Sequence, residues 1–379
     1  MIYFDNNATT MIAPGVVECM MPFLTGSYGN PSSAHNLGAD AKLAVDDARA
    51  GLAELIGAAS LGEIAFTSGG TESDNWAITG SLTTDKNHII TTRVEHEAVR
   101  KQCEKLETTG VRVTWLDVDG TGALDLDGLR DSLNENTALV SVMMANNETG
   151  VLFDVDQIGQ IVKERSNALF HVDGVNAVGK VLIDLKKTVI DLFSLSGHKF
   201  HGPKGIGALY IHNGVTLPSF LTGGGQENGR RAGTEAVHQI VGIGAAARFV
   251  KDMSPMPKIR AMRDRLENEI LNCIPNSRVN GTRDAAKRLP NTLNISFENT
   301  NGEAILAKLN DQGICVSTGS ACNSQDHTAS AVLQAMDVPY SWAMGSIRFS
   351  LGRYNTEAEV DLVIDKLPKI VDELRAIAA

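Results

Sequence analysis

The sequence has no basic excess and no long apolar run, and each absence argues against a class of function. Lys and Arg number 34 against 45 Asp and Glu, which gives a formal net charge of −11. Such a chain has few cations to spare for phosphates, so nucleic acid is not expected as a main partner. No apolar run approaches about eighteen residues, and no charged segment followed by an apolar stretch opens the chain. We therefore expect no membrane span and no secretory signal, and we predict a cytoplasmic location.

Cysteine is scarce, and its spacing fits no structural framework. The chain has 5 cysteines, an odd number with wide spacing and no CxxC pair. This pattern suits neither a set of disulfides nor a zinc site, so no metal is expected. Cys315 lies between two apolar residues, as a small buried hydrophobe would. Cys322 lies instead in the small, polar loop Thr318-Gly-Ser-Ala-Cys-Asn-Ser324, where mobility would suit a reactive thiol.

Short apolar runs alternate with helical spacing over the middle of the chain. A chain of 379 residues exceeds a typical single core, so two domains are expected. Strands are predicted at 63–67, 88–91, 111–116, 138–144, 168–172, 191–195 and 207–211. The alternation predicts an α/β fold with a mostly parallel sheet and helices on both faces. Ligands of such sheets bind outside the carboxyl ends of the strands.

The pattern changes beyond about residue 250. A linker-like segment is followed by an amphipathic helix, a strand and a second helix. The pattern then predicts a further strand and a closing helix. These elements are expected at 259–270, 292–297, 303–309, 346–350 and from Glu357 onward. They predict a second, smaller α+β domain.

A lysine and an aspartate follow neighbouring predicted strands. Lys199 closes the turn Ser196-Gly-His-Lys199, and Asp173 follows the strand at 168–172. This arrangement suits pyridoxal phosphate (PLP): the lysine would form a Schiff base, and the aspartate would keep the pyridine nitrogen protonated. Taken alone, Lys199 would be an ordinary surface lysine beside a turn.

Other strand ends carry polar residues with two interpretations each. The segment Ser68-Gly-Gly-Thr71 would be a phosphate cup at a helix N-terminus or a mere capping turn. His96 would stack on a cofactor ring or simply begin a helix. Arg348, between two apolar residues, would be a carboxylate clamp or a solvated charge. The Gly- and Arg-rich segment 223–234 predicts a loop that could reach an anion, even across a subunit interface.

Taken in order, these segments resemble the NifS/IscS-like cysteine desulfurases, PLP enzymes of the class V aminotransferase fold. The likeness covers nearly the whole chain. The matching segments are 3–10, 28–33, 67–73, 196–199, 319–322 and 348–353. The opening Asp5-Asn-Asn-Ala-Thr-Thr10 and the segment Arg230-Arg-Ala-Gly-Thr-Glu235 look most like the NifS branch.

The resemblance implies chemical roles for four residues. Lys199 would carry the Schiff base and then act as the base, and Asp173 would pair with the pyridinium. His96 would stack on the ring. Cys322 would attack the substrate sulfur and become a persulfide.

The remaining matches imply binding roles. The cofactor would be bound by Gly70, Thr71, Asn147, Asn176, Ser196, His198 and, from the partner subunit of a homodimer, Thr234. Arg348 and Asn147 would bind the substrate carboxylate. Two departures from the family stand out: Asn176 replaces a common Gln, and residues 323–330 lack a Leu-Glu-Pro-Ser run. Many relatives also have a longer C-terminal tail. This difference and the second departure leave the identity of the sulfur acceptor open.

The resemblance also implies the reaction and the domain division. L-cysteine would become L-alanine, and the Cys322 persulfide would donate sulfur to an acceptor such as an iron–sulfur scaffold. Selenocysteine lyase, aminotransferase and non-catalytic sulfur-relay functions remain alternatives. The large PLP-binding domain is predicted over 14–255, and the small domain with the cysteine loop over 1–13 and 256–379.

Overall fold

A central sheet of seven strands organises the chain. The computed structural model describes residues 1–318 and 329–378. The strands of the sheet are β2 (Ile64–Thr67), β3 (His88–Thr92), β4 (Arg112–Leu116), β5 (Thr137–Met143), β6 (Leu169–Asp173), β7 (Leu192–Ser196) and β8 (Gly207–Ile211). Their order across the sheet is β2-β8-β7-β6-β5-β3-β4. All seven predicted strands are present, and their bounds agree within one residue at each end.

One strand breaks the parallel pattern. β8 runs antiparallel to both of its neighbours, β7 and β2, whereas the other pairs are parallel. The connection from β7 to β8 covers residues 197–206 and contains only the short 3-10 turn η3 (Gly197–Lys199). Because a parallel return needs a crossover of a dozen or more residues, this short connection makes the strand run back antiparallel. The prediction of a mostly parallel sheet is confirmed.

Both faces of the sheet are buried, and the strand pleat divides its apolar side chains between two cores. In β2, Ile64 and Phe66 belong to one hydrophobic core and Ala65 to the other. In β3, Ile90 and Ile89 divide in the same way. This is the period of two that a strand imposes.

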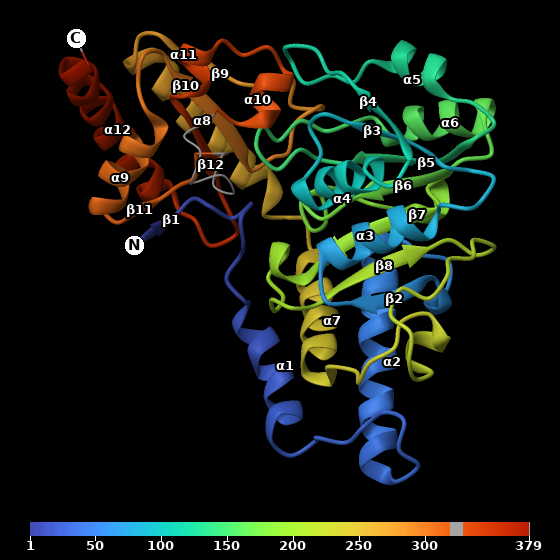
Figure 1. Cartoon of the computed structure of the whole chain (residues 1–379). Helices are drawn as coiled ribbons and strands as arrows, with labels where there is room; N and C mark the ends of the chain where they lie inside the picture. The colour runs from blue at the N-terminus through green and yellow to red at the C-terminus, as the bar shows by residue number, and fades with distance from the viewer. Residues whose placement is uncertain (319–328, 379) are drawn as a thin grey trace.

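The helices complete these two layers. Helices α3 (Gly70–Gly80) and α4 (Glu97–Glu107) supply the core that contains Ala65 and Ile89. The opposite core contains residues of α1 (Pro14–Thr25), α2 (Asn36–Ile56), α5 (Leu126–Ser132), α6 (Val155–Arg165) and α7 (Val237–Lys251). Figure 1 shows α1, α7 and α2 beneath the sheet, with their axes pointing away from it.

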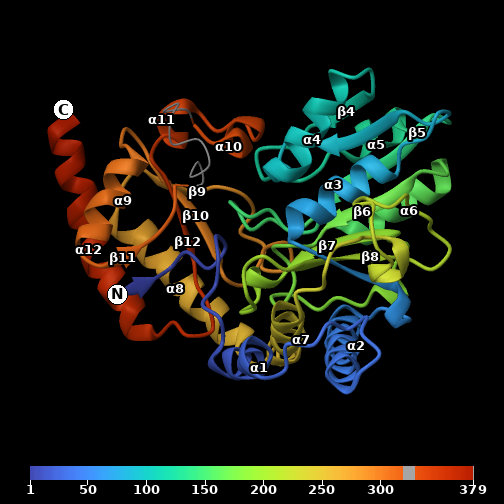
Figure 2. The same cartoon turned by 60° about the horizontal axis from the view of Figure 1, so that its bottom comes forward.

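A separate hydrophobic core lies beside the sheet (Figure 2). It is built on the antiparallel strands β9 (Ser277–Val279), β10 (Thr292–Phe297) and β12 (Ser346–Ser350). The helices that pack there are α8 (Met256–Cys273), α9 (Gly302–Asp311) and α12 (Glu357–Ala378). The N-terminus joins this core, because β1 (Ile2–Tyr3) pairs in parallel with β11 (Ile314–Cys315). The short helices α10 (Ala331–Ala335) and α11 (Tyr340–Ala343) instead contribute to the core that contains Ile64.

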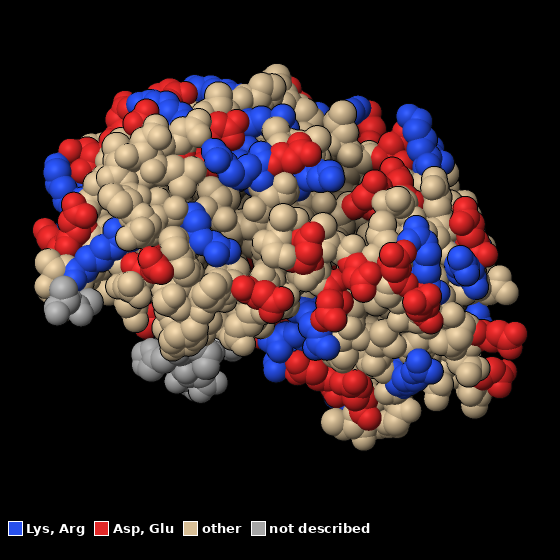
Figure 3. Space-filling model, turned by 90° about the horizontal axis from the view of Figure 1, so that it is seen from above, with Lys and Arg blue, Asp and Glu red and all other residues tan. Residues whose placement is uncertain are grey.

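The surface carries charges of both signs. On the face in Figure 3, Lys and Arg side chains are interspersed with Asp and Glu. No helix within the described residues has both the length and the apolar character needed to cross a membrane.

Helices α2 and α7 pack closely through small residues. A Cβ atom added at Gly244 of α7 would lie 2.5 Å from the Cα of Ala48 in α2. A Cβ at Gly51 would in turn lie 3.1 Å from the carbonyl oxygen of Gly244. The contact is therefore between backbones, which have no room to move aside.

We expect Gly244→Val to lower the free energy of unfolding by about 1–3 kcal/mol, the usual cost of overpacking a core. Urea denaturation followed by circular dichroism would measure it. Gly15→Val is the matched control, since a Cβ at this α1 position meets nothing within 4 Å. Equal losses in the two variants would contradict the close helix contact.

Candidate active site

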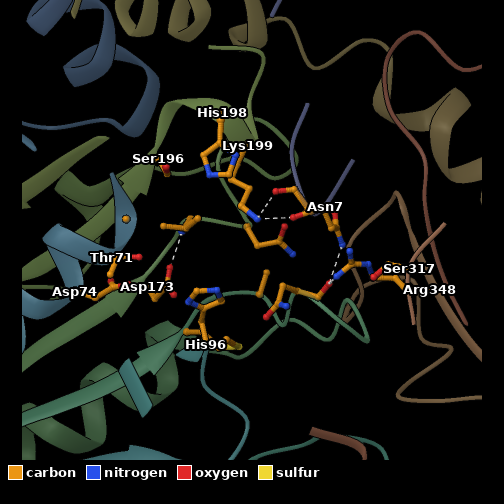
Figure 4. A pocket seen from close by; sticks show the side chains of 17 residues that line it. Asn7, Thr71, Asp74, His96, Asp173, Ser196, His198, Lys199, Ser317 and Arg348 are labelled. Atoms are coloured by element: carbon orange, nitrogen blue, oxygen red, sulfur yellow. Dashed lines mark hydrogen bonds between the residues drawn. The ribbon is translucent and has the colours of Figure 1, made fainter. Parts of the chain in front are cut away.

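A cavity of about 310 Å³ lies at the carboxyl ends of β3, β5, β6 and β7 (Figure 4). The predicted site residues that line it are Gly70, Thr71, His96, Asn147, Asp173, Asn176, Ser196, His198, Lys199 and Arg348. Arg348 and Ser317 belong to the side of the second core, so the cavity lies between the two halves of the fold. Thr234 is exposed and is not among the lining residues. Cys322 lies outside the described residues.

Lys199 reaches the cavity from the turn that follows β7. Gly197 allows this turn, because a Cβ there would lie 3.1 Å from the carbonyl oxygen of Pro203. The Lys199 ammonium donates to the main-chain oxygens of Asn7 at 2.5 Å and Ala8 at 3.0 Å. The N-terminal segment therefore holds the lysine side chain at the cavity wall.

Two buried carboxyl groups line the cavity. Asp173, the last residue of β6, accepts a hydrogen bond on Oδ1 from the Val175 amide at 2.9 Å. Burial raises the pKa of Asp173, while His96 and Lys199 lower it. Burial and the negative charge of Asp173 raise the pKa of Asp74 well above its usual value. Asp74 therefore keeps its proton more readily, and Asp173 is the carboxylate available to a cationic ligand.

The two histidines of the cavity are neutral. His96 caps the start of α4, and its Nδ1 accepts from the Ala98 amide at 3.1 Å. Burial lowers the pKa of His96, so its single proton lies on Nε2. Burial, followed by the positive charge of Lys199, lowers the pKa of His198 to about 4. His198 Nδ1 lies 3.1 Å from the hydroxyl of Thr9.

The N-terminus of α3 forms a cradle for an anion. The helix begins at Gly70, directly after the strand β2. A Cβ at Gly70 would lie 2.6 Å from Cγ2 of Val175, so only glycine leaves the helix end open to the cavity. Free amide groups and the helix dipole at such an end favour negative charge. Thr71, Ser196 and His198 add side-chain donors around it.

The first turn of α3 also contains an acidic residue, Glu72, whose charge is paired and so does not repel an anion at the helix end. Nε and Nη2 of the Arg231 guanidinium donate to the two oxygens of the Glu72 carboxylate, at 2.7 and 2.9 Å. It also accepts from the Ser68 amide at 2.7 Å. Its charge is thus neutralised within the loop that carries Thr234.

Arg348 brings a guanidinium to the opposite wall. It is 5% exposed, and its Nη2 donates to Asp5 at 2.6 Å while Nη1 donates to the main-chain oxygen of Asn147 at 3.0 Å. Its Nε atom is buried and has no hydrogen-bond partner in the described part of the chain. Arg348 lines the cavity, and a guanidinium there is a suitable partner for a carboxylate.

Several lining residues were not among those predicted from sequence: Asn7, Ala8, Asp74, Met143, Ala145, Val175 and Ser317. Asn7 and Ala8 lie in the segment 3–10 that marked the resemblance, which was the signal for them, and Asp74 directly follows the segment 67–73. Val175 and Ser317 had none, because their place depends on tertiary packing. Across residues 1–318 and 329–378, no group of three or more His, Cys, Asp and Glu side chains is arranged to hold a metal ion.

The cavity fits PLP. The cradle at α3 suits its phosphate, the Asp173 carboxylate suits a protonated pyridine nitrogen, and Lys199 offers the amine that its aldehyde needs. These three features lie in one cavity of sufficient size for a small cofactor with a small substrate.

Comparison with known proteins identifies the family. Residues 2–363 match the family model described as aminotransferase class-V. The chain is 54% identical to a cysteine desulfurase of Trichormus azollae, over 100% of this chain and 94% of the relative. It is 47% identical to the cysteine desulfurase NifS of Azotobacter vinelandii, with the same coverage of both chains.

A solved structure agrees with these sequence relatives. It is named NifS-like protein and superposes with a TM-score of 0.91 at 38% identity, covering 98% of this chain and 100% of the other. The enzymes of this family depend on PLP, which matches the fit of the cavity. The chain belongs to the aminotransferase class-V family and, within it, to the cysteine desulfurases.

Proposed function

We propose that the protein is a PLP-dependent cysteine desulfurase that converts L-cysteine to L-alanine and keeps the sulfur as a persulfide on Cys322. The observation that carries this proposal is the single cavity in which Lys199, Asp173 and the α3 cradle face Arg348. The family supports the same reaction, since named cysteine desulfurases match the whole chain.

The first task of the chain is to hold the cofactor. Lys199 would bind its aldehyde carbon covalently, and Asp173 would hold its ring nitrogen protonated. His96 would lie on its ring face. Gly70, Thr71, Ser196 and His198 would bind its phosphate, with Asn147 and Asn176 as further contacts. When bound, PLP supplies an electron sink for charge that develops on the substrate.

The second task is to orient the substrate and move its protons. Arg348 would bind the cysteine carboxylate, with Asn147 beside it. Lys199, when its Nζ is free, would take the proton from the substrate α-carbon. The neutral His96 carries its proton on Nε2, where it can donate to an atom of the substrate.

The third task is sulfur transfer. The thiolate of Cys322 would attack the sulfur of the substrate, forming an S–S bond as the C–S bond breaks. The electron pair of the C–S bond returns to the β-carbon, which then takes a proton. The products are alanine and a cysteine persulfide, so no external oxidant or reductant is required.

A homodimer is part of the proposal. The loop that carries Thr234 is held on its own subunit by Glu227, which binds Arg49 at 2.7 and 2.9 Å. Thr234 itself is exposed, so it can serve the cofactor phosphate of the partner. Exposed apolar side chains gather on and around α1 and α2, as on an interface: Met11, Val17, Met21, Leu24, Tyr28, Leu37 and Leu43.

The proposal also covers the sulfur acceptor, the cellular location and the domain division. We propose that the persulfide serves a sulfur acceptor such as an iron–sulfur scaffold. Free cysteines at positions 19, 103, 273 and 315 suit a reducing, cytoplasmic environment. We also propose the division into a large domain over 14–255 and a small one over 1–13 and 256–379. The separate core that joins Ile2 and Phe4 to residues beyond 256 supports it.

Lys199→Ala should abolish alanine formation from L-cysteine, because both the covalent hold on the cofactor and the base are lost. The purified wild type should be yellow, and borohydride reduction followed by peptide mapping should place the pyridoxyl group on Lys199. Lys204→Ala, five residues away and exposed, is the control and should keep colour and turnover. A label on another lysine would refute the assignment.

Arg348→Lys should raise the KM for L-cysteine about ten- to a hundredfold. It keeps the positive charge but loses the planar fork, and a hydrogen bond to a charged group contributes about 1.5–3 kcal/mol. Steady-state kinetics would measure this, together with PLP affinity, which should change much less. Arg265→Ala, which removes a surface ion pair with Glu357 and Asp361, should leave KM unchanged. An unaltered KM in Arg348→Lys would mean that the carboxylate binds elsewhere.

Cys322→Ala should still bind L-cysteine and perturb the cofactor spectrum, yet form almost no alanine. Mass spectrometry should find a persulfide on Cys322 of the wild type and on no cysteine of the variant. The exposed Cys273 provides the control variant, Cys273→Ala, which should behave as wild type. Wild-type alanine production without Cys322 would overturn the proposed mechanism.

The same assay separates the alternative functions by their products. Pyruvate with free sulfide would indicate a lyase. Amino transfer only with an added 2-oxo acid would indicate an aminotransferase, and turnover restricted to selenocysteine would indicate a selenocysteine lyase.

A further inference from the structure

A buried lysine beneath the cavity has no role in the proposed function so far. Lys180 is 8% exposed and lies in the turn after β6. The turn is held by hydrogen bonds from Ala177 and Val178 to the Gly174 oxygen, at 2.9 and 3.1 Å. Gly179, with φ of 75°, adopts a left-handed conformation that few other residues tolerate. This turn directs Lys180 into the interior, where it lines a second cavity of about 30 Å³ together with Lys199.

Lys180 is bound to one residue of the active site. Its ammonium donates to the main-chain oxygen of Asn176 at 2.8 Å and to the carboxamide Oδ1 of the same residue at 3.0 Å. Burial, and then the positive charges of Lys199 and Arg348, lower the pKa of Lys180. Even a neutral amine has two N–H groups, which is enough for both oxygens of Asn176.

This contact decides which way the Asn176 carboxamide faces. With Oδ1 toward Lys180, the Nδ2 amide lies on the other side, where it donates to the Asn146 oxygen at a long 3.4 Å. Asn176 also lines the main cavity, so its second N–H is left for a ligand there. The opposite orientation would place the amide N–H groups against a donor of Lys180 and Oδ1 against the Asn146 oxygen, which is unfavourable.

We propose that Lys180 is a positioning residue that holds the Asn176 carboxamide with its N–H side toward the active-site cavity, where it donates to an oxygen of the bound cofactor. The proposal rests on the proposed function, because it takes PLP as the occupant. The phenolic oxygen of PLP is an acceptor of the required kind. A donor to this oxygen stabilises its negative charge and thereby lowers the pH at which the bound cofactor loses its proton.

Absorption spectroscopy of the holoenzyme tests this without any measurement of turnover. The visible absorption band of bound PLP changes with pH. In Lys180→Met, the pH at the midpoint of this change should rise by about one unit or more. Asn176→Ala should give a similar rise. The double variant should rise no further than the larger single variant, because both changes remove the same contact. Lys187→Met, a change in a surface ion pair with Asp184, should leave the midpoint unchanged.

Other outcomes have distinct meanings. Additive rises in the double variant would show that Lys180 acts as a charge and not through Asn176, and would overturn the proposal, as would an unchanged midpoint in Lys180→Met. If Lys180→Met does not fold, Asn176→Asp tests the same contact, since a carboxylate keeps the bond from Lys180 but offers no N–H. Its midpoint should also rise, and a wild-type value would overturn the proposal. A wild type that binds no PLP would instead overturn the proposed function.

Discussion

Asp173 places a carboxylate at the end of β6, 4% exposed, and the rest of the cavity is arranged around that charge. Burial acts against the ionised form of the group and raises its pKa. A second buried acid, Asp74, lies near enough for the charge of Asp173 to raise its own pKa further. One proton on Asp74 therefore relieves the repulsion and leaves a single anion. That anion is most stable when a cation binds against it, which is the condition that a protonated pyridine ring satisfies.

The N-terminal segment joins the two halves of the fold at this site. The main-chain oxygens of Asn7 and Ala8 accept from Lys199, in the turn that follows β7 of the large sheet. Asp5, two residues earlier, pairs with Arg348 of β12. The segment itself is fixed because β1 pairs with β11 beside the second core. A short stretch near the start of the chain thus sets the position of both Lys199 and Arg348, although these residues lie far apart in sequence.

The sequence predicted the elements whose apolar pattern is strong and the residues that lie in specific motifs. All seven strands of the sheet follow from pattern alone. α7 was not predicted, because Gly242, Gly244 and neighbouring alanines replace the usual apolar stripe with a close helix contact. β1 and β11 are two residues each, too short for any pattern. Lys180 could not be recognised, since a lysine after a glycine normally predicts a surface turn.

The charge state of the cavity connects these features to the chemistry. Burial lowers the pKa of His96 and His198, and it lowers the pKa of the deeper His171 to about 3. The three imidazoles are therefore neutral and act as hydrogen-bond donors and acceptors, not as fixed charges. Among the described residues that line the cavity, the charged side chains are then Lys199, Arg348, which is paired with Asp5, and Asp173. The helix end of α3 and Arg348 favour negatively charged groups, and Asp173 favours a positively charged one. The phosphate and the protonated pyridine ring of PLP suit the first and the last of these. Because burial makes every unmatched charge costly, this small set of fixed charges selects a ligand with that distribution of groups.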